Sequence, residues 1–185
     1  MVAALAQPDL FQMDSGLAET IDPILPEEIS TLAEDVLELA KTKDLRLASA
    51  ESCTGGLLAA VLTDVSGLSH VFERAFVTYS DEAKCEMLDC DSSEIENCGA
   101  VSREVAVAMA QGALKKSEAD IVVSITGFAG PAGPTDEEGL VHFACLRNGE
   151  APEHCERHFG EIGRDGVRLA ALEVALMMMK NALLK

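Results

Sequence analysis

The sequence contains no tryptophan and one tyrosine, and aromatic residues make up only 4% of its 185 positions. Hydrophobic residues still reach 48% of the chain. The core must therefore be built from alanine, leucine, valine, isoleucine and methionine. This length and composition are sufficient for one ordinary α/β domain with a real core.

Positive charge is also scarce, because 14 lysines and arginines stand against 32 acidic residues and the net charge is −18. Such a charge argues against nucleic acid and anionic membrane surfaces as partners. No apolar run approaches the ~20 residues of a membrane span, and residues 1–14 lack the basic region of a signal peptide. These observations predict a cytoplasmic protein, in which an anionic substrate needs local positive charge.

The six cysteines form no C-x-x-C pair. A chain this apolar needs no disulfide framework, so we expect free thiols in a reducing cytosol. Because paired ligand spacings are missing, the sequence predicts no zinc site. The tightest His/Cys group, His154-Cys155 with His158, is interpreted as part of the exposed face of a strand. No metal and no cofactor are expected.

Residues 1–24 show no periodicity and are predicted to be a flexible extension, and residues 25–185 are predicted to form one domain. The predicted fold is a three-layer α/β/α sandwich with a mixed, mostly parallel sheet and a C-terminal β-hairpin at Asn148-Gly149. Residues 90–97 are polar and are predicted to be a turn, and residues 127–139 a loop. The first predicted helix begins at Pro26, and the others cover 55–65, 81–88, 103–116 and 164–184. The predicted strands cover 45–50, 74–79, 121–125, 140–146 and 155–159.

The run Glu51-Ser52-Cys53-Thr54-Gly55-Gly56 stands between a predicted strand and a predicted helix. Ser52 is therefore either a nucleophile at a helix N-terminus or simply a helix cap. Backbone N–H groups from Cys53 to Gly56 could stabilise an oxyanion there. Two further loops, 79–84 and 126–139, also follow predicted strands, and ligand sites of open α/β sheets form beyond the carboxyl ends of strands.

Four motifs in order resemble the C-terminal domain of the competence/damage-inducible protein CinA. The resemblance covers about residues 27–184, and it implies an amidohydrolase whose substrate is a pyridine nucleotide, nicotinamide mononucleotide, with a dimer as the usual assembly. The motifs are Glu51-Ser52-Cys53-Thr54-Gly55-Gly56, Phe76-Val77-Thr78-Tyr79-Ser80-Asp81-Glu82-Ala83-Lys84, Gly99-Ala100-Val101-Ser102 and Gly127-Phe128-Ala129-Gly130-Pro131.

The resemblance also implies roles for particular residues. Ser52 matches the family's nucleophile and Lys84 its general base, and Tyr79, which matches a tyrosine of the same motif, is the third expected catalytic residue. The family's C-terminal Arg pair falls on Arg164 and Arg168, which would bind the substrate phosphate. The remaining candidate substrate-binding residues are Cys53, Thr54, Gly55, Gly56, Thr126, Gly127 and Gly130.

Lys84 carries the strictest physical requirement of this hypothesis. No histidine lies in the three loops, so a lysine would have to take the serine proton as a neutral amine. Lowering a lysine pKa by roughly three units costs about 4 kcal/mol, and the net charge of −18 works against it. We therefore expect Lys84 to be buried, near a cation, and not ion-paired with Glu51 or Glu82.

Several simpler interpretations stand beside these roles. Cys53 could be the nucleophile, Lys84 a solvated surface lysine, and Ser102 a helix cap. Thr126 could satisfy only backbone groups, and the glycines of 127–133 could serve only turns.

Two departures from the family pattern leave the function open. The residue before Arg164 is glycine where the family has aspartate, and residues 131–139 lack the lysine that many relatives carry. The alternatives are a nucleotide-binding module without catalysis and an amidase for a different amide.

Overall fold

The computed structural model describes residues 25–131 and 133–185. The predicted flexible extension, residues 1–24, lies outside the described residues. The helices are α1 (Glu27–Thr42), α2 (Leu57–Asp64), α3 (Asp81–Leu88), α4 (Ser92–Cys98), α5 (Arg103–Lys115) and α6 (Gly163–Leu184). The strands are β1 (Leu47–Glu51), β2 (Phe72–Val77), β3 (Ile121–Gly127), β4 (Leu140–Arg147) and β5 (Glu153–His158).

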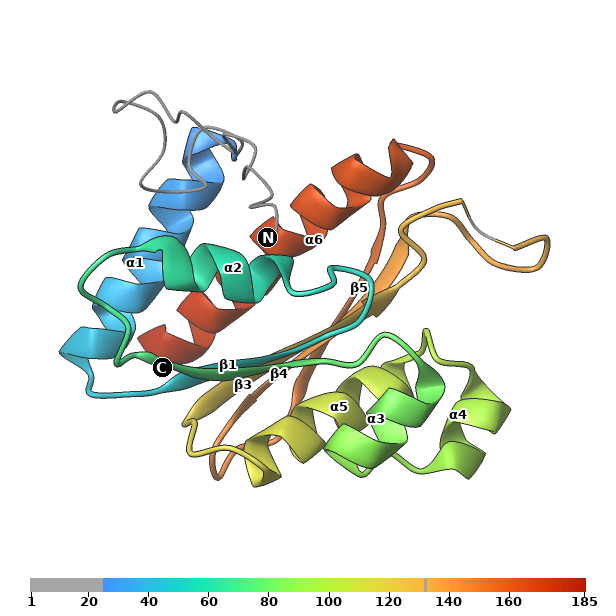
Figure 1. Ribbon diagram of the computed structural model, residues 1–185, viewed down its shortest axis with the longest axis horizontal. Helices are drawn as coiled ribbons and strands as arrows, with labels where there is room; N and C mark the ends of the chain where they lie inside the picture. The colour runs from blue at the N-terminus through green and yellow to red at the C-terminus, as the bar shows by residue number, and fades with distance from the viewer. Residues whose placement is uncertain (1–24, 132) are drawn as a thin grey trace, which may run out of the picture.

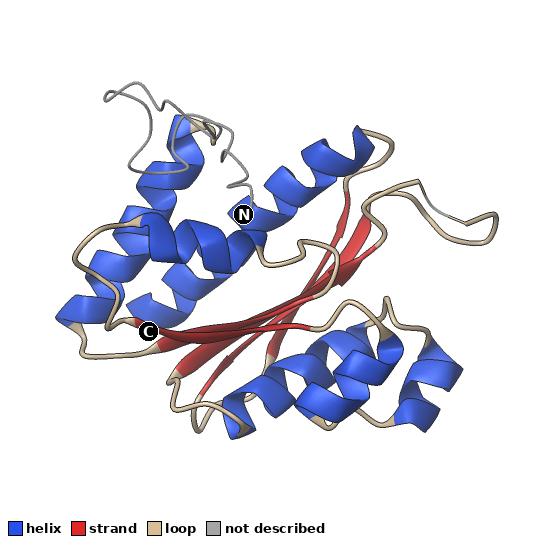
Figure 2. Ribbon diagram, in the orientation of Figure 1, coloured by secondary structure: helices blue, strands red, loops and turns tan. Residues whose placement is uncertain are grey.

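The strands form one mixed sheet in the order β2-β1-β3-β4-β5. β1 pairs with β2 and β3 in parallel, whereas β3–β4 and β4–β5 are antiparallel. β5 consequently runs in the same direction as β1, β2 and β3. Helices α1, α2 and α6 cover one face of the sheet, and α3, α4 and α5 cover the other (Figures 1 and 2). The predicted three-layer α/β/α sandwich with a C-terminal hairpin is confirmed.

The two faces of the sheet are buried in two different hydrophobic clusters. β3 is buried along its first six residues, which explains its almost continuous apolar sequence. Along β1 the residues alternate between clusters, since Leu47 packs on the α1–α6 side while Ala48 and Ala50 pack against α5. This alternation decides on which side of the sheet the next residues, Glu51 and Ser52, place their side chains.

The prediction of a turn at residues 90–97 is wrong, because Ser92–Cys98 forms helix α4. The Asp91 side chain caps this helix by accepting a hydrogen bond from the Ser93 backbone N–H at 2.8 Å. Only Ile95 is buried within it. A helix this short with one buried apolar residue shows no periodicity in the sequence, so the cap was its only signal.

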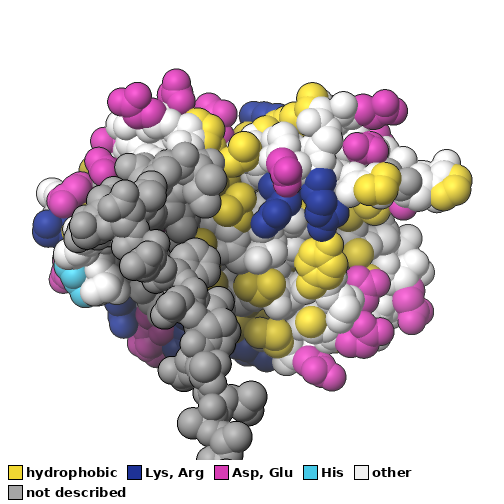
Figure 3. Space-filling view, turned by 45° about the horizontal axis from the view of Figure 1, so that its top comes forward, with side chains coloured by type: hydrophobic (Ala, Val, Ile, Leu, Met, Phe, Trp, Pro, Cys, Tyr) yellow, Lys and Arg dark blue, Asp and Glu magenta, His cyan; other side chains and the backbone are white. Residues whose placement is uncertain are grey.

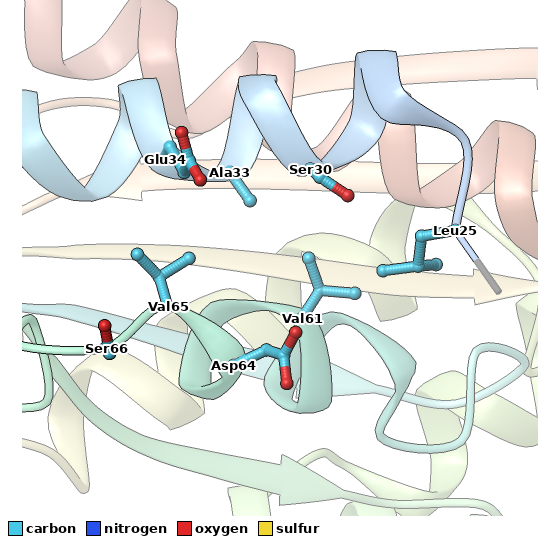
Figure 4. A pocket seen from close by; sticks show the side chains of 8 residues that line it. All are labelled: Leu25, Ser30, Ala33, Glu34, Val61, Asp64, Val65 and Ser66. Carbon is cyan, nitrogen blue, oxygen red and sulfur yellow. The ribbon is translucent and has the colours of Figure 1, made fainter. Parts of the chain in front are cut away.

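A cavity of about 150 Å³ lies between α1 and α2, where Ser30, Ala33, Val61 and Val65 contribute to its walls (Figure 4). Neither Ser52 nor Lys84 lines it, and neither lines the two larger cavities of about 430 and 450 Å³. Cavity size therefore does not locate the predicted site, which has to be identified from its side chains.

In the described part of the chain no helix combines the length and the apolar character needed to cross a membrane.

Candidate active site

Glu51, the last residue of β1, is fully buried and holds the turn that follows it. Its carboxylate accepts hydrogen bonds from the backbone N–H groups of Gly56 (3.0 Å), Leu58 (3.1 Å) and Ala59 (2.9 Å). The hydroxyls of Thr54 (2.7 Å) and Ser49 (3.2 Å) donate to it as well. One carboxylate thus caps α2 and fixes the loop that carries Ser52.

This arrangement corrects the expectation that the N–H groups from Cys53 to Gly56 are all free for an oxyanion. The Gly56 N–H binds Glu51, and the Gly55 N–H donates to the Ser52 carbonyl at 3.0 Å. Within residues 25–131 and 133–185, the N–H groups of Cys53 and Thr54 donate to no other residue, and the Cys53 N–H lies near its own thiol. Gly55 and Gly56 instead adopt φ angles of 60° and 91°, which explains why glycine occupies these turn positions.

Ser52 and Lys84 lie together at the carboxyl edge of the sheet. The Lys84 Nζ donates a hydrogen bond to Ser52 Oγ at 3.4 Å, and both side chains are buried, with 8% of Ser52 and 2% of Lys84 exposed. Lys84 comes from α3, which begins at the Ser80 cap. Glu51 and Ser52 therefore point to opposite faces, one to α2 and the other to α3. The interpretation of Lys84 as a solvated surface lysine is wrong.

The structure places a carboxylate beside Lys84 in place of the expected cation. Its ion-pair partner within the described chain is Asp81, whose Oδ1 lies 3.7 Å from Lys84 Nζ. Asp81 precedes Lys84 by three residues on the same helix, so both side chains share one face. Neither Glu51 nor Glu82 is ion-paired with Lys84, as expected. Because 57% of the Asp81 side chain is exposed, water weakens its attraction for an ammonium group.

Two arginines of α6 reach the other side of the Ser52 loop. Arg168 donates to the Thr54 carbonyl at 2.9 Å, and Arg164 donates to the Gly130 carbonyl at 2.9 Å and to the Tyr79 hydroxyl at 2.7 Å. Tyr79 therefore lies against Arg164, and its side chain is exposed. In Figure 3, basic side chains gather beside hydrophobic ones on a molecule that is otherwise rich in acidic side chains.

The other predicted residues fill mainly structural positions. The Thr126 hydroxyl donates to the Ala100 carbonyl at 2.8 Å, and Ser102 caps α5 by accepting from the Val105 N–H. Gly127 is required by close packing, because a Cβ atom there would lie 2.8 Å from the Leu140 carbonyl oxygen. Gly130 contributes its carbonyl to the site, where it accepts a hydrogen bond from Arg164.

Sequence reasoning did not identify three features of the site: the capping role of Glu51, the ion pair of Asp81, and Thr78. The Thr78 hydroxyl is buried without a hydrogen-bond partner in the described structure, and so is Arg168 Nε. Buried polar atoms without partners are uncommon and are candidates for ligand contacts. The signal for Glu51 was an acidic residue at the end of an apolar strand, immediately before Ser-Cys-Thr-Gly-Gly.

Cys53, the alternative nucleophile, is a buried thiol. Its pKa is raised to about 12, chiefly by burial and also by the nearby Glu51 carboxylate, although its own backbone N–H, Arg164 and Arg168 act to lower it. The thiolate, which is the reactive form, is therefore scarce at neutral pH. This environment favours Ser52 over Cys53 as the nucleophile.

The fold and the site together define an open α/β domain with a buried Ser–Lys pair at the carboxyl edge of its sheet. Residues 29–183 match the family model described as the CinA C-terminal domain. The chain therefore belongs to the CinA C-terminal domain family, which confirms the resemblance inferred from its motifs.

Known relatives agree with this assignment. The chain is 44% identical over 155 residues to the nicotinamide-nucleotide amidohydrolase PncC of Escherichia coli K12, covering 82% of this chain and 93% of that protein. It is 40% identical over 184 residues to a competence-damage inducible protein of Caldicellulosiruptor saccharolyticus, but spans only 44% of that protein's length. The crystal structure of the competence/damage inducible protein CihA from Agrobacterium tumefaciens superimposes with a TM-score of 0.83 at 41% identity, covering 87% of this chain and 98% of that chain.

The capping role of Glu51 predicts a large stability effect at this one position. Glu51→Gln replaces an acceptor oxygen with an NH₂ group that faces N–H donors, so we expect a loss of about 3 kcal/mol in the free energy of unfolding. Urea unfolding measures this loss. Glu38→Gln, at an exposed residue of α1, is the matched control and should change stability by less than about 0.5 kcal/mol. Equal effects of the two substitutions would contradict the capping role.

The raised pKa of Cys53 predicts selective alkylation. Iodoacetamide at pH 8 should modify the exposed Cys98 of the folded protein and leave Cys53 unmodified, because the buried thiol stays protonated and inaccessible. Peptide mass spectrometry before and after unfolding in urea measures both sites. Modification of Cys53 at the rate of Cys98 in the folded protein would refute this description of the thiol.

Proposed function

We propose that this protein hydrolyses the carboxamide of nicotinamide mononucleotide to nicotinate mononucleotide and ammonia, with Ser52 as nucleophile and Lys84 as general base. The observation that carries the proposal is the buried hydrogen bond between Lys84 Nζ and Ser52 Oγ. The similarity to a protein named nicotinamide-nucleotide amidohydrolase supports the substrate class. Such a reaction would serve pyridine nucleotide recycling. A cytoplasmic location and a homodimer stay predictions.

In the proposed mechanism, the neutral Lys84 amine takes the Ser52 proton while Oγ bonds to the amide carbon. The N–H groups of Cys53 and Thr54 are the donors left to bind the resulting oxyanion. The C–N bond then breaks, and the leaving nitrogen takes the proton from Lys84 and departs as ammonia. Water attacks the Ser52 ester as Lys84 accepts its proton, and Ser52 Oγ recovers that proton when the carboxylate product leaves.

The arginines of α6 would supply the positive charge that an anionic nucleotide needs in a chain of net charge −18. Arg164 and Arg168 stand on the opposite side of the Ser52 loop from Lys84, and each keeps at least one guanidinium nitrogen without a partner among the described residues. A guanidinium binds phosphate oxygens well. Tyr79, held against Arg164, would border the same phosphate rather than take part in proton transfer.

A second candidate is a nucleotide-binding module without catalysis, and the Asp81 ion pair is the observation that favours it. A carboxylate 3.7 Å from Lys84 Nζ stabilises the ammonium form, which cannot accept the Ser52 proton. In that case the Ser–Lys contact would hold the loop in place only. The two candidates differ in one respect that can be measured directly, the release of ammonia.

The amidase proposal predicts that the protein releases ammonia from nicotinamide mononucleotide. Ser52→Ala and Lys84→Met should each lower this rate by at least about 1,000-fold, because nucleophile and base act as a unit. Methionine conserves the volume of the buried lysine and should preserve the fold. An enzyme-coupled ammonia assay measures the rate.

Ser66→Ala and Lys115→Met, at exposed positions, are the matched controls and should keep the wild-type rate. Nucleotide binding by the wild type without ammonia release would favour the non-catalytic module. Ammonia release from another amide, but not from nicotinamide mononucleotide, would point to a different substrate.

A further inference from the structure

Three side chains that could bind a metal lie on one face of the β4–β5 hairpin. His142 on β4 pairs with Glu156 on β5, and the neighbouring pair is Ala144 with His154. Residues two apart on a strand point to the same face, so His154 and Glu156 share a face with His142. Ala144 packs with Ala106 and Ala110 of α5, which places this group on the α5 side of the sheet. The group is separate from Ser52, which lies beyond the end of β1.

The distances between the donor atoms match those of a small metal site. His142 Nδ1 lies 3.1 Å from His154 Nε2 and 3.6 Å from Glu156 Oε2, and the three atoms all lie within 4.8 Å of one another. Zn²⁺ binds nitrogen and oxygen ligands at about 2.0–2.2 Å, so the ligand atoms of a tetrahedral site stand roughly 3.4 Å apart. A cation between the three atoms would need only a small movement of Glu156, whose side chain is exposed.

The protonation states also suit a cation. Burial lowers the pKa of His142, and burial together with the neighbouring His142 ring lowers the pKa of His154. A hydrogen bond with His158 lowers the pKa of Glu156. Two neutral imidazoles and one carboxylate are the forms that coordinate a metal. Without a cation, the imidazole nitrogens of His142 and His154, 3.1 Å apart, form a hydrogen bond in which one nitrogen carries the proton and the other accepts it.

The surroundings of the three residues support a positive ion. The His158 ring is hydrogen-bonded to Glu156, at 2.8 Å, and to Glu137, at 2.6 Å. It can therefore orient the Glu156 carboxylate. Such outer partners orient metal ligands. The charge of Glu104 on α5 also acts on both His142 and His154, whereas Arg103 opposes a cation at His154. Glu104, Glu137 and Glu156 thus stand against Arg103 and the His158 ring, whose charge also acts on His142.

We propose that His142, His154 and Glu156 form a binding site for a divalent cation of the Zn²⁺ type, with one coordination position open to solvent. The ligand set favours Zn²⁺ over Mg²⁺ or Ca²⁺, because two of the three donors are imidazole nitrogens. The sequence predicted no zinc site because paired ligand spacings are missing, and the group of His154, Cys155 and His158 was interpreted as surface. His142 stands twelve residues earlier and reaches the cluster only through the hairpin pairing.

Titration of the metal-free protein with Zn²⁺ in a calorimeter tests this site, with Co²⁺ absorption as a second probe. We expect one ion per chain, and a Co²⁺ spectrum without the intense thiolate charge-transfer band that the six cysteines could otherwise produce. His142→Ala and His154→Ala should each weaken Zn²⁺ binding by more than about 100-fold. His158→Ala, which removes only the outer partner, should weaken it by about 10–100-fold.

His70→Ala removes an exposed histidine outside the cluster and should leave Zn²⁺ affinity unchanged. If the buried His142 variant fails to fold, Glu156→Gln at an exposed position decides the question, and it should weaken binding at least tenfold. Three results would each overturn the proposal: no binding by the wild type, equal affinity in wild type and the cluster variants, or a thiolate band in the Co²⁺ complex. None of these readouts depends on amidase activity.

Discussion

The buried carboxylate of Glu51 is the interaction on which the rest of the site depends. It accepts hydrogen bonds from three N–H groups at the start of α2 and from two hydroxyls, and no part of the residue is exposed. Because consecutive strand residues point to opposite faces, fixing Glu51 toward α2 directs Ser52 toward α3 and Lys84. The same contacts occupy N–H groups at the start of α2, whereas those of Cys53 and Thr54 donate to no other residue in the described ranges.

Charge is distributed unevenly around this loop. Lys84 and its exposed partner Asp81 lie on the α3 side, while Arg164 and Arg168 approach from α6 on the other face. The acidic excess of the chain therefore does not describe the local site, where Lys84 contacts Ser52 and two arginines contact Thr54, Gly130 and Tyr79. The proposed mechanism requires a neutral Lys84 amine, although Asp81 Oδ1 lies 3.7 Å from Lys84 Nζ. The Lys84 side chain is nearly completely buried, whereas Asp81 is exposed and its charge is screened by water.

The sequence predicted most of the fold, because β3, α1, α5 and α6 carry strong apolar patterns or capping residues. It did not predict α4, whose single buried residue, Ile95, leaves no periodicity. For the site, ordered motifs brought Ser52, Lys84, Tyr79 and the two arginines into the argument. Their contacts depend on tertiary structure, however, and could not be derived from spacing.

The features that the sequence could not supply are interactions between separate elements. The sequence predicted only that Glu51 does not pair with Lys84, and it did not predict that Glu51 caps α2. His142 was not grouped with His154 in the sequence, and it lies 3.1 Å from His154 across the hairpin. Both depend on which strand or helix lies next to the residue, and a linear pattern contains that information only when the topology is known.

The most direct test of the central claim, that Ser52 attacks the amide with Lys84 as its base, is to find the covalent intermediate. The protein would be mixed with nicotinamide mononucleotide, quenched in acid within the first turnover, and digested for peptide mass spectrometry. A nicotinoyl-nucleotide ester should form on Ser52 of the wild type and be absent when Lys84 is replaced by methionine. An adduct on Cys53 instead, or ammonia release with no adduct on Ser52 at any quench time, would contradict it.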